Sequence, residues 1–166
     1  MNINQIGFLD VSACTATFVR LYREKLKPDA SYEGAETLLL RGAESDSPLL
    51  KEWASARKLL ARLKNEAAPF LNGKPAILGK VLIVSLKPGA FTPWQIDDSE
   101  YGQDHLRLYI NLIPSPMAFL YSGGEMSNPA VGSVTYFNTS VLHSEINLGP
   151  CARVSMVIDV KRPDQD

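Results

Sequence analysis

Two segments in the C-terminal half of the chain alternate apolar and polar residues with a period of two, and this pattern constrains the fold most. Residues 106–112 and 153–160 each place apolar side chains at every second position, which is the spacing of a strand with one buried face. The opposite faces carry Arg107, Tyr109 and Asn111 in the first segment and Arg153, Ser155 and Asp159 in the second. Because these are not the Lys and Glu of a typical solvated surface, we expect them to line a pocket. The alternative is a face in contact with water.

Further short strands are predicted around these two segments. Their residues are β-branched or apolar, and clusters of Pro, Gly and Asn separate them. The predicted strands are residues 80–86, 118–121, 133–137 and 141–147. Such a series of short strands joined by turns favours an antiparallel β-sandwich or barrel.

The N-terminal half is predicted to be a scaffold of helices and edge strands. Residues 6–9 and 37–40 are short apolar runs that suit strands. A first helix follows Asp10, which can cap its N-terminus, and its apolar positions are spaced by three and four. These positions are Val11, Cys14, Phe18, Val19, Tyr22 and Leu26. A second helix is expected to begin at Ser47-Pro48 and to carry one continuous apolar stripe from Leu49 to Leu63.

The length of the chain and the position of its turn residues favour a single domain with two parts. The chain has 166 residues and a mass of 18.3 kDa, which is enough to bury one core without disulfides or metal. Pro69 and the run Asn72-Gly73-Lys74-Pro75 separate the helical pattern from the strand pattern. We therefore predict one domain over residues 1–166, with the helical scaffold and edge strands in 1–75 and the β core in 76–162.

Charge and hydropathy argue against several classes of function. A net charge of −1 gives no positive surface for nucleic acid or a membrane, and no run of eighteen apolar residues could span a bilayer. The N-terminus lacks the basic and apolar regions of a signal peptide, so we expect a cytoplasmic protein. Cys14 and Cys151 form neither a disulfide framework nor a metal-binding spacing, and we expect two reduced thiols.

Several short motifs follow one another between residues 80 and 160. They are Pro93-Trp94-Gln95-Ile96-Asp97, Arg107-Leu108-Tyr109, Gly132, His143-Ser144-Glu145-Ile146-Asn147-Leu148-Gly149 and Arg153-Val154-Ser155-Met156-Val157-Ile158-Asp159. Their order resembles the aspartyl/asparaginyl β-hydroxylase family, whose members typically carry His-X-Asp, a distal His and, ten residues later, an Arg. His143 and Arg153 have this separation. The resemblance implies a mainly β fold with N-terminal helices, built as a double-stranded β-helix (a cupin-like jelly roll).

The resemblance also implies an activity and a set of ligands. Members of the family are dioxygenases that depend on Fe(II) and 2-oxoglutarate, so the chain would hydroxylate an amino acid or a peptidyl residue, with a small molecule or a peptide as its substrate. Asp97 and His143 would be catalytic and, with Gln95, would hold the iron. Arg153 would grip a carboxylate of 2-oxoglutarate in a bidentate contact, and Ser155 would donate to the same oxygens.

Arg107 and Tyr109 would supply further contacts to cosubstrate or substrate. The sequence departs from the family pattern at Gln95. Gln95 stands where the family carries its first His, and an amide oxygen binds Fe(II) more weakly than imidazole. Either Gln95 ligates weakly, or His105 takes its place, or the site holds no iron.

Two other functions therefore stay open. In the first, the domain is a catalytically silent cupin-like module that binds a small carboxylate through Arg153 and Arg107. In the second, it is an unrelated β-sandwich with an interaction function, in which Asp97 and His143 would lie far apart. The sequence does not determine the oligomeric state.

Overall fold

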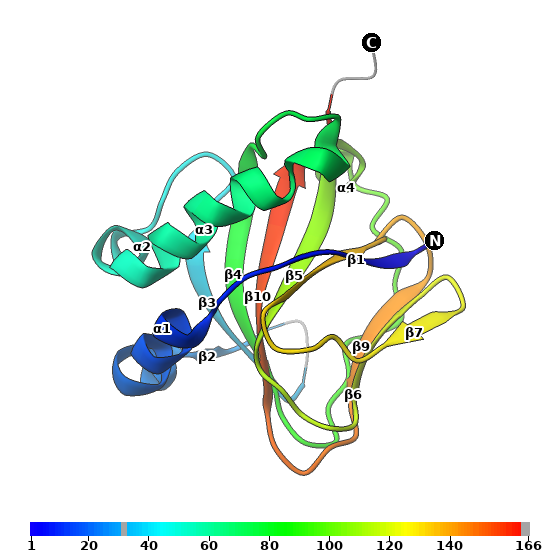
Figure 1. Ribbon diagram of the computed structural model, residues 1–166. Coiled ribbons are helices and arrows are strands. Elements are labelled where there is room, and N and C mark those ends of the chain that lie inside the picture. The colour runs from blue at the N-terminus through cyan, green and yellow to red at the C-terminus, as the bar shows by residue number, and fades with distance from the viewer. Residues whose placement is uncertain (31–32, 164–166) are drawn as a thin grey trace.

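Two antiparallel β-sheets face each other in the computed structural model, which describes residues 1–30 and 33–163 (Figure 1). The larger sheet has the strand order β1-β8-β5-β10-β4-β3-β2. Its strands are β1 (Ile3–Phe8), β2 (Lys27–Pro28), β3 (Ala35–Arg41), β4 (Leu78–Leu86), β5 (His105–Ile113), β8 (Ser133–Phe137) and β10 (Arg153–Lys161). The smaller sheet has the order β7-β6-β9 and consists of β6 (Ala118–Ser122), β7 (Glu125–Ser127) and β9 (His143–Asn147). Every predicted strand overlaps one of these elements.

The two alternating segments are neighbours in the middle of the larger sheet. β5 and β10 are paired in an antiparallel register that sets Arg107 opposite Asp159 and Tyr109 opposite Val157. The apolar faces of both strands are fully buried, as Leu108 and Ile158 illustrate at 0% exposure. Because side chains alternate across a strand, the polar faces of β5 and β10 point together toward the smaller sheet.

Helices cover the outer face of the larger sheet (Figure 1). They are α1 (Ser12–Thr17), which continues into a π-helical turn (Phe18–Tyr22) and a 3-10 turn (Arg23–Lys25), α2 (Pro48–Glu52) and α3 (Ala54–Glu66), which continues into a 3-10 turn (Ala68–Leu71). The buried side chains of α3 join those of β4, β5 and β10 in one apolar cluster. A further short helix, α4 (Glu100–Asp104), precedes β5. No helix among the described residues is both long and apolar enough to cross a membrane.

The helices differ from the sequence prediction at two points. The second helix begins as predicted, with the Leu50 amide donating to Ser47 Oγ at 3.2 Å, but it is broken at Trp53, whose backbone (φ −86°, ψ 82°) separates α2 from α3. The break buries the Trp53 ring against Tyr22, with ring centroids 4.6 Å apart. Val19, expected on the buried face of the first helix, is 46% exposed, because the adjacent Phe18 fills the contact with the core.

The N-terminal half also completes the larger sheet. β1 pairs with β8 at one end of the sheet, and β3 pairs with β4 near the other end. These strands contain most of the two short apolar runs predicted as strands. The last three residues of the predicted domain, 164–166, lie outside the described residues.

Candidate functional site

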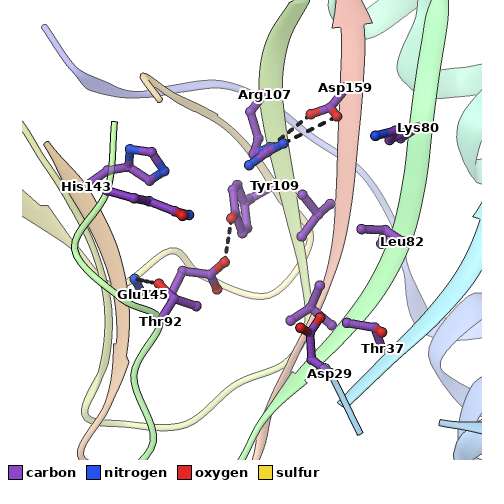
Figure 2. Close-up of a pocket in the computed structure, with 13 residues that line it drawn as sticks. Asp29, Thr37, Lys80, Leu82, Thr92, Arg107, Tyr109, His143, Glu145 and Asp159 are labelled. Atoms are coloured by element: carbon purple, nitrogen blue, oxygen red, sulfur yellow. Dashed lines mark hydrogen bonds and ion pairs between the residues drawn. The ribbon is translucent and has the colours of Figure 1, made fainter. Parts of the chain in front are cut away.

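A pocket of about 210 Å³ lies between the two sheets. One wall comes from the polar faces of β5 and β10 together with β4, and the other comes from β9 and the extended segment 90–97 beside it (Figure 2). The residues that line it are Asp29, Thr37, Lys80, Leu82, Val84, Thr92, Gln95, Arg107, Tyr109, His143, Glu145, Val157 and Asp159. The lining therefore combines polar and charged side chains with the apolar side chains of Leu82, Val84 and Val157.

Backbone hydrogen bonds fix segment 90–97 against β9. The Thr92 amide donates to the Glu145 carbonyl at 2.9 Å. Gln95 and His143 exchange two amide-to-carbonyl bonds of 3.2 and 3.0 Å. Residues directly opposite in such a pair have side chains on the same face, about 5 Å apart at Cβ. Gln95 and His143 are therefore adjacent on the pocket wall.

His143 presents an unpaired ring nitrogen. The side chain is 3% exposed, and Nδ1 lies 2.9 Å from the Val141 carbonyl oxygen, to which it donates. Nε2 is then a lone-pair acceptor, and among the described residues it is buried without a hydrogen-bond partner. Burial lowers the pKa of His143 below its ordinary value, and the positive charge of Arg107 acts in the same direction. The ring is therefore a neutral acceptor at the pocket wall.

Glu145 forms a buried cluster with Tyr109 and Arg153. The Tyr109 hydroxyl donates to Glu145 Oε1 at 2.5 Å, and Arg153 Nη2 forms an ion pair with Glu145 Oε2. Arg153 is 2% exposed and does not line the pocket. Burial and the facing Glu145 carboxylate raise the pKa of Tyr109 well above its ordinary value, so its hydroxyl stays protonated and donates.

A second ion pair joins the polar faces of β5 and β10. Arg107 Nε lies 2.9 Å from Asp159 Oδ1, and Arg107 Nη2 lies 3.3 Å from Asp159 Oδ2. Figure 2 shows this bidentate pair across the pocket from His143, with Lys80 beside it. Lys80 Nζ also sits over the ring of Tyr101, 4.6 Å from its centroid, so both cations near this wall have partners.

Four residues that the resemblance placed at the site do not line the pocket, and Arg153 is one of them. The Asp97 carboxylate accepts a hydrogen bond of 2.6 Å from Ser99 Oγ and packs against Gly102 of α4. Its negative charge acts to raise the pKa of His143, against the larger effect of burial. His105 stacks on Tyr101 with ring centroids 3.9 Å apart, and Ser155 is buried in β10. Gln95, Arg107, Tyr109 and His143 do line it.

Asp159 was expected from the sequence to line a pocket but was given no role there, and Glu145 and Thr92 were not expected at the site. A signal for two of them was present. Glu145 follows His143 by two residues and so shares its face of β9, and Asp159 stands on the same polar face as Arg153. The contact of Thr92 depends on how segment 90–97 pairs with β9, where Thr92 Oγ1 accepts from the Glu145 amide at 2.8 Å.

Solved structures with this fold include a member of the 2-oxoglutarate/Fe(II) oxygenase family. No protein-family model matches the chain, and no curated protein sequence matches it significantly. A prolyl-4-hydroxylase from Pseudomonas putida superposes with a TM-score of 0.66 at 14% identity, covering 98% of this chain and 94% of that one. A viral collagen prolyl hydroxylase from Paramecium bursaria Chlorella virus-1, in complex with 2-oxoglutarate, gives 0.67 at 14%, covering 99% and 97%. AviO1 from Streptomyces viridochromogenes gives 0.63 at 22%, covering 98% and 90%. The predicted double-stranded β-helix is confirmed.

The residues present do not fit the cofactor pair that this fold implies. An iron site of this type needs two imidazoles and a carboxylate converging on one point, whereas His143 is the only imidazole on the pocket wall. No three His, Cys, Asp or Glu side chains of the described residues are grouped to hold a metal ion. Arg153, the implied clamp for 2-oxoglutarate, is already paired with Glu145. Iron would therefore lack a second imidazole ligand on the described pocket wall, and 2-oxoglutarate would meet an arginine that is already paired.

Proposed function

We propose that the protein is a catalytically silent double-stranded β-helix module that binds a small, uncharged polar molecule in the pocket between its sheets. The observation that carries this proposal is the buried Nε2 of His143, a hydrogen-bond acceptor without a partner among the described residues. A buried polar atom left unpaired costs about 1–3 kcal/mol. A ligand that donates an O–H or N–H to this nitrogen would remove that cost.

The charge balance of the pocket supports a neutral ligand. The acids are Asp29, Glu145 and Asp159, and the bases in the pocket or directly behind its wall are Lys80, Arg107 and Arg153. Arg107 and Arg153 both have carboxylate partners from the chain itself. An incoming carboxylate would have to displace one of these partners. A hydroxyl or amide group could bind without separating either ion pair.

Ligand-observed NMR with small probes tests the proposal. The probes are glucose, glycerol and acetamide as neutral molecules and succinate as an acid of similar size. We expect at least one neutral probe to bind and its affinity to fall about two- to tenfold in H143F, since one hydrogen bond contributes roughly 0.5–1.5 kcal/mol. The H143F ring keeps the edge-to-face contact with Phe137. Binding of succinate with no binding of any neutral probe would contradict the proposal.

A second candidate function is a 2-oxoglutarate/Fe(II) oxygenase acting on an amino acid or a peptidyl residue. It is favoured by the orientation of His143, because metal-binding histidines commonly donate the other ring nitrogen to a backbone carbonyl, as Nδ1 does to Val141. This function would require Asp97 to leave Ser99 and Glu145 to leave Arg153. It predicts that Fe(II) and 2-oxoglutarate bind together, whereas the ligand-binding proposal predicts that they do not.

A further inference from the structure

Glu145 differs from an ordinary buried ion-pair partner in its position. Its side chain lines the pocket together with Tyr109, whose hydroxyl donates to it, while the Arg153 guanidinium that pairs with it is buried and does not line the pocket. Arg153 Nη1 is a further buried donor without a partner among the described residues. A guanidinium with a spare N–H beside a phenol O–H is a set of donors suited to a carboxylate.

We propose that Glu145 is an internal carboxylate that occupies a built acid-binding site, and that it is the residue that excludes carboxylate ligands from the pocket. The site consists of Arg153 and Tyr109, and its ligand class is a small monocarboxylate or one end of a dicarboxylate. Glu145 is attached to the same rigid strand as His143, so it competes at a high effective concentration with any free acid. The proposal extends the proposed function by naming the residue that sets its ligand class.

A purely structural ion pair and an occupied ligand site respond differently to truncation. Removing a carboxylate from a closed core leaves a charged arginine that no solute can reach. Removing it from a pocket wall leaves a hole that opens into the pocket. Glu145→Ala deletes the side chain beyond Cβ, and the deleted atoms have the size and charge of acetate. Acetate should therefore fill the hole in E145A and pair with Arg153.

Thermal unfolding in 100 mM sodium acetate, compared with 100 mM sodium chloride at the same pH, tests this prediction. If acetate binds E145A with a Kd of about 10 mM, the folding equilibrium constant rises about elevenfold. That gain corresponds to an increase in Tm of roughly 3–6 °C for a chain of this size. The wild-type protein should have the same Tm in both salts, because Glu145 already fills the site.

Two variants serve as controls. E145A/R153M lacks the cation and should lose the difference between acetate and chloride. E36A removes a carboxylate from an exposed ion pair with Lys87 and should show no difference either. Should E145A fail to fold in both salts, E145T takes its place, because its shorter side chain also vacates the site and its hydroxyl can accept from Tyr109.

Each possible outcome of these experiments either supports the proposal or overturns it. The proposal is supported if acetate raises the Tm of the truncated variant but not that of the wild-type protein or of E145A/R153M. It is also supported if the truncated variant folds only in acetate. Equal Tm values in the two salts for a folded truncated variant overturn it. Wild-type protein that binds succinate through Arg153 overturns it as well. None of these measurements uses a neutral ligand. If no neutral probe binds the wild-type protein, the proposed function fails, but the effect of acetate on the Tm of E145A still tests the role of Glu145.

Discussion

Arg107 and Arg153 project from the polar faces of neighbouring strands, and each meets a carboxylate of its own chain. Asp159 lies in the strand beside Arg107, and Glu145 reaches Arg153 from the opposite sheet. Because both arginines are paired within the chain, a carboxylate of 2-oxoglutarate would have to displace Asp159 or Glu145 to reach either of them. Lys80, a further cation on the pocket wall, lies over the ring of Tyr101. On the opposite wall, the side chain beside His143 is the amide of Gln95, which binds Fe(II) more weakly than an imidazole does.

The pairing of Gln95 with His143 predicts a gain of metal binding in Q95H. Two histidines opposite each other on adjacent antiparallel strands can share one ion, since Cβ separations of about 5 Å suit metal–nitrogen distances of about 2.0–2.1 Å. We expect Ni²⁺ to bind Q95H at least about tenfold more tightly than the wild-type protein, measured by calorimetry. Q95H/H143A should return to the wild-type affinity. Equal Ni²⁺ affinities for Q95H and the wild-type protein would show that the two side chains do not converge.

The lowered pKa of His143 predicts a pH dependence of stability. The ordinary pKa of 6.5 applies in the unfolded chain and a lower value in the folded one, so unfolding takes up a proton below pH 6.5. Stability should therefore fall as the pH drops from 6.5 through the folded-state pKa, by about 1.4 kcal/mol per unit of pKa difference. Urea unfolding at a series of pH values measures this slope. H143Q should lose the His143 contribution and H105Q should retain it; the same slope in all three proteins would refute the assignment.

At the scale of elements, the two central strands of the larger sheet followed from the sequence because they alternate with a strict period of two. The alternation located β5 and β10 and separated their buried faces from their polar faces. The break at Trp53 was not predictable from periodicity, because Trp53 fits the apolar stripe of an uninterrupted helix. The Glu145–Arg153 pair was missed for a different reason: it joins β9 to β10 across the two sheets, and local patterns carry no information on contacts between sheets.

The packing of α3 on the larger sheet predicts a large effect of truncation at Leu63. Its side chain is 0% exposed, and Leu63→Ala leaves a cavity between helix and sheet. We expect the free energy of unfolding to fall by about 2–5 kcal/mol, measured by urea denaturation. Leu39→Ala provides the matched control, because Leu39 is 51% exposed and exposed positions change stability by about 0.5 kcal/mol or less. Similar losses in L63A and L39A would contradict this packing.

At the scale of the whole molecule, the helices shield one thiol and leave the other accessible. Cys14 lies on the buried face of α1 and burial raises its pKa to about 12, whereas Cys151 is exposed. Since the thiolate is the reactive species, we expect one thiol per native chain to react quickly with Ellman's reagent and the second to react only on unfolding. C151S should remove the fast phase. A fast phase of two thiols would show that the helical layer is open.

The whole molecule thus combines a double-stranded β-helix, a fold that it shares with solved prolyl hydroxylases, with a pocket whose described lining has one imidazole, that of His143, and in which Glu145 is paired with Arg153. The most direct test is an anaerobic titration of the metal-free protein with Fe(II), with and without 2-oxoglutarate, followed by the charge-transfer absorption of a keto acid chelated to iron. We predict no such band for the wild-type protein. A band that requires both Fe(II) and 2-oxoglutarate would show that Asp97 and Arg153 are available after all, and the protein would then be studied as an oxygenase.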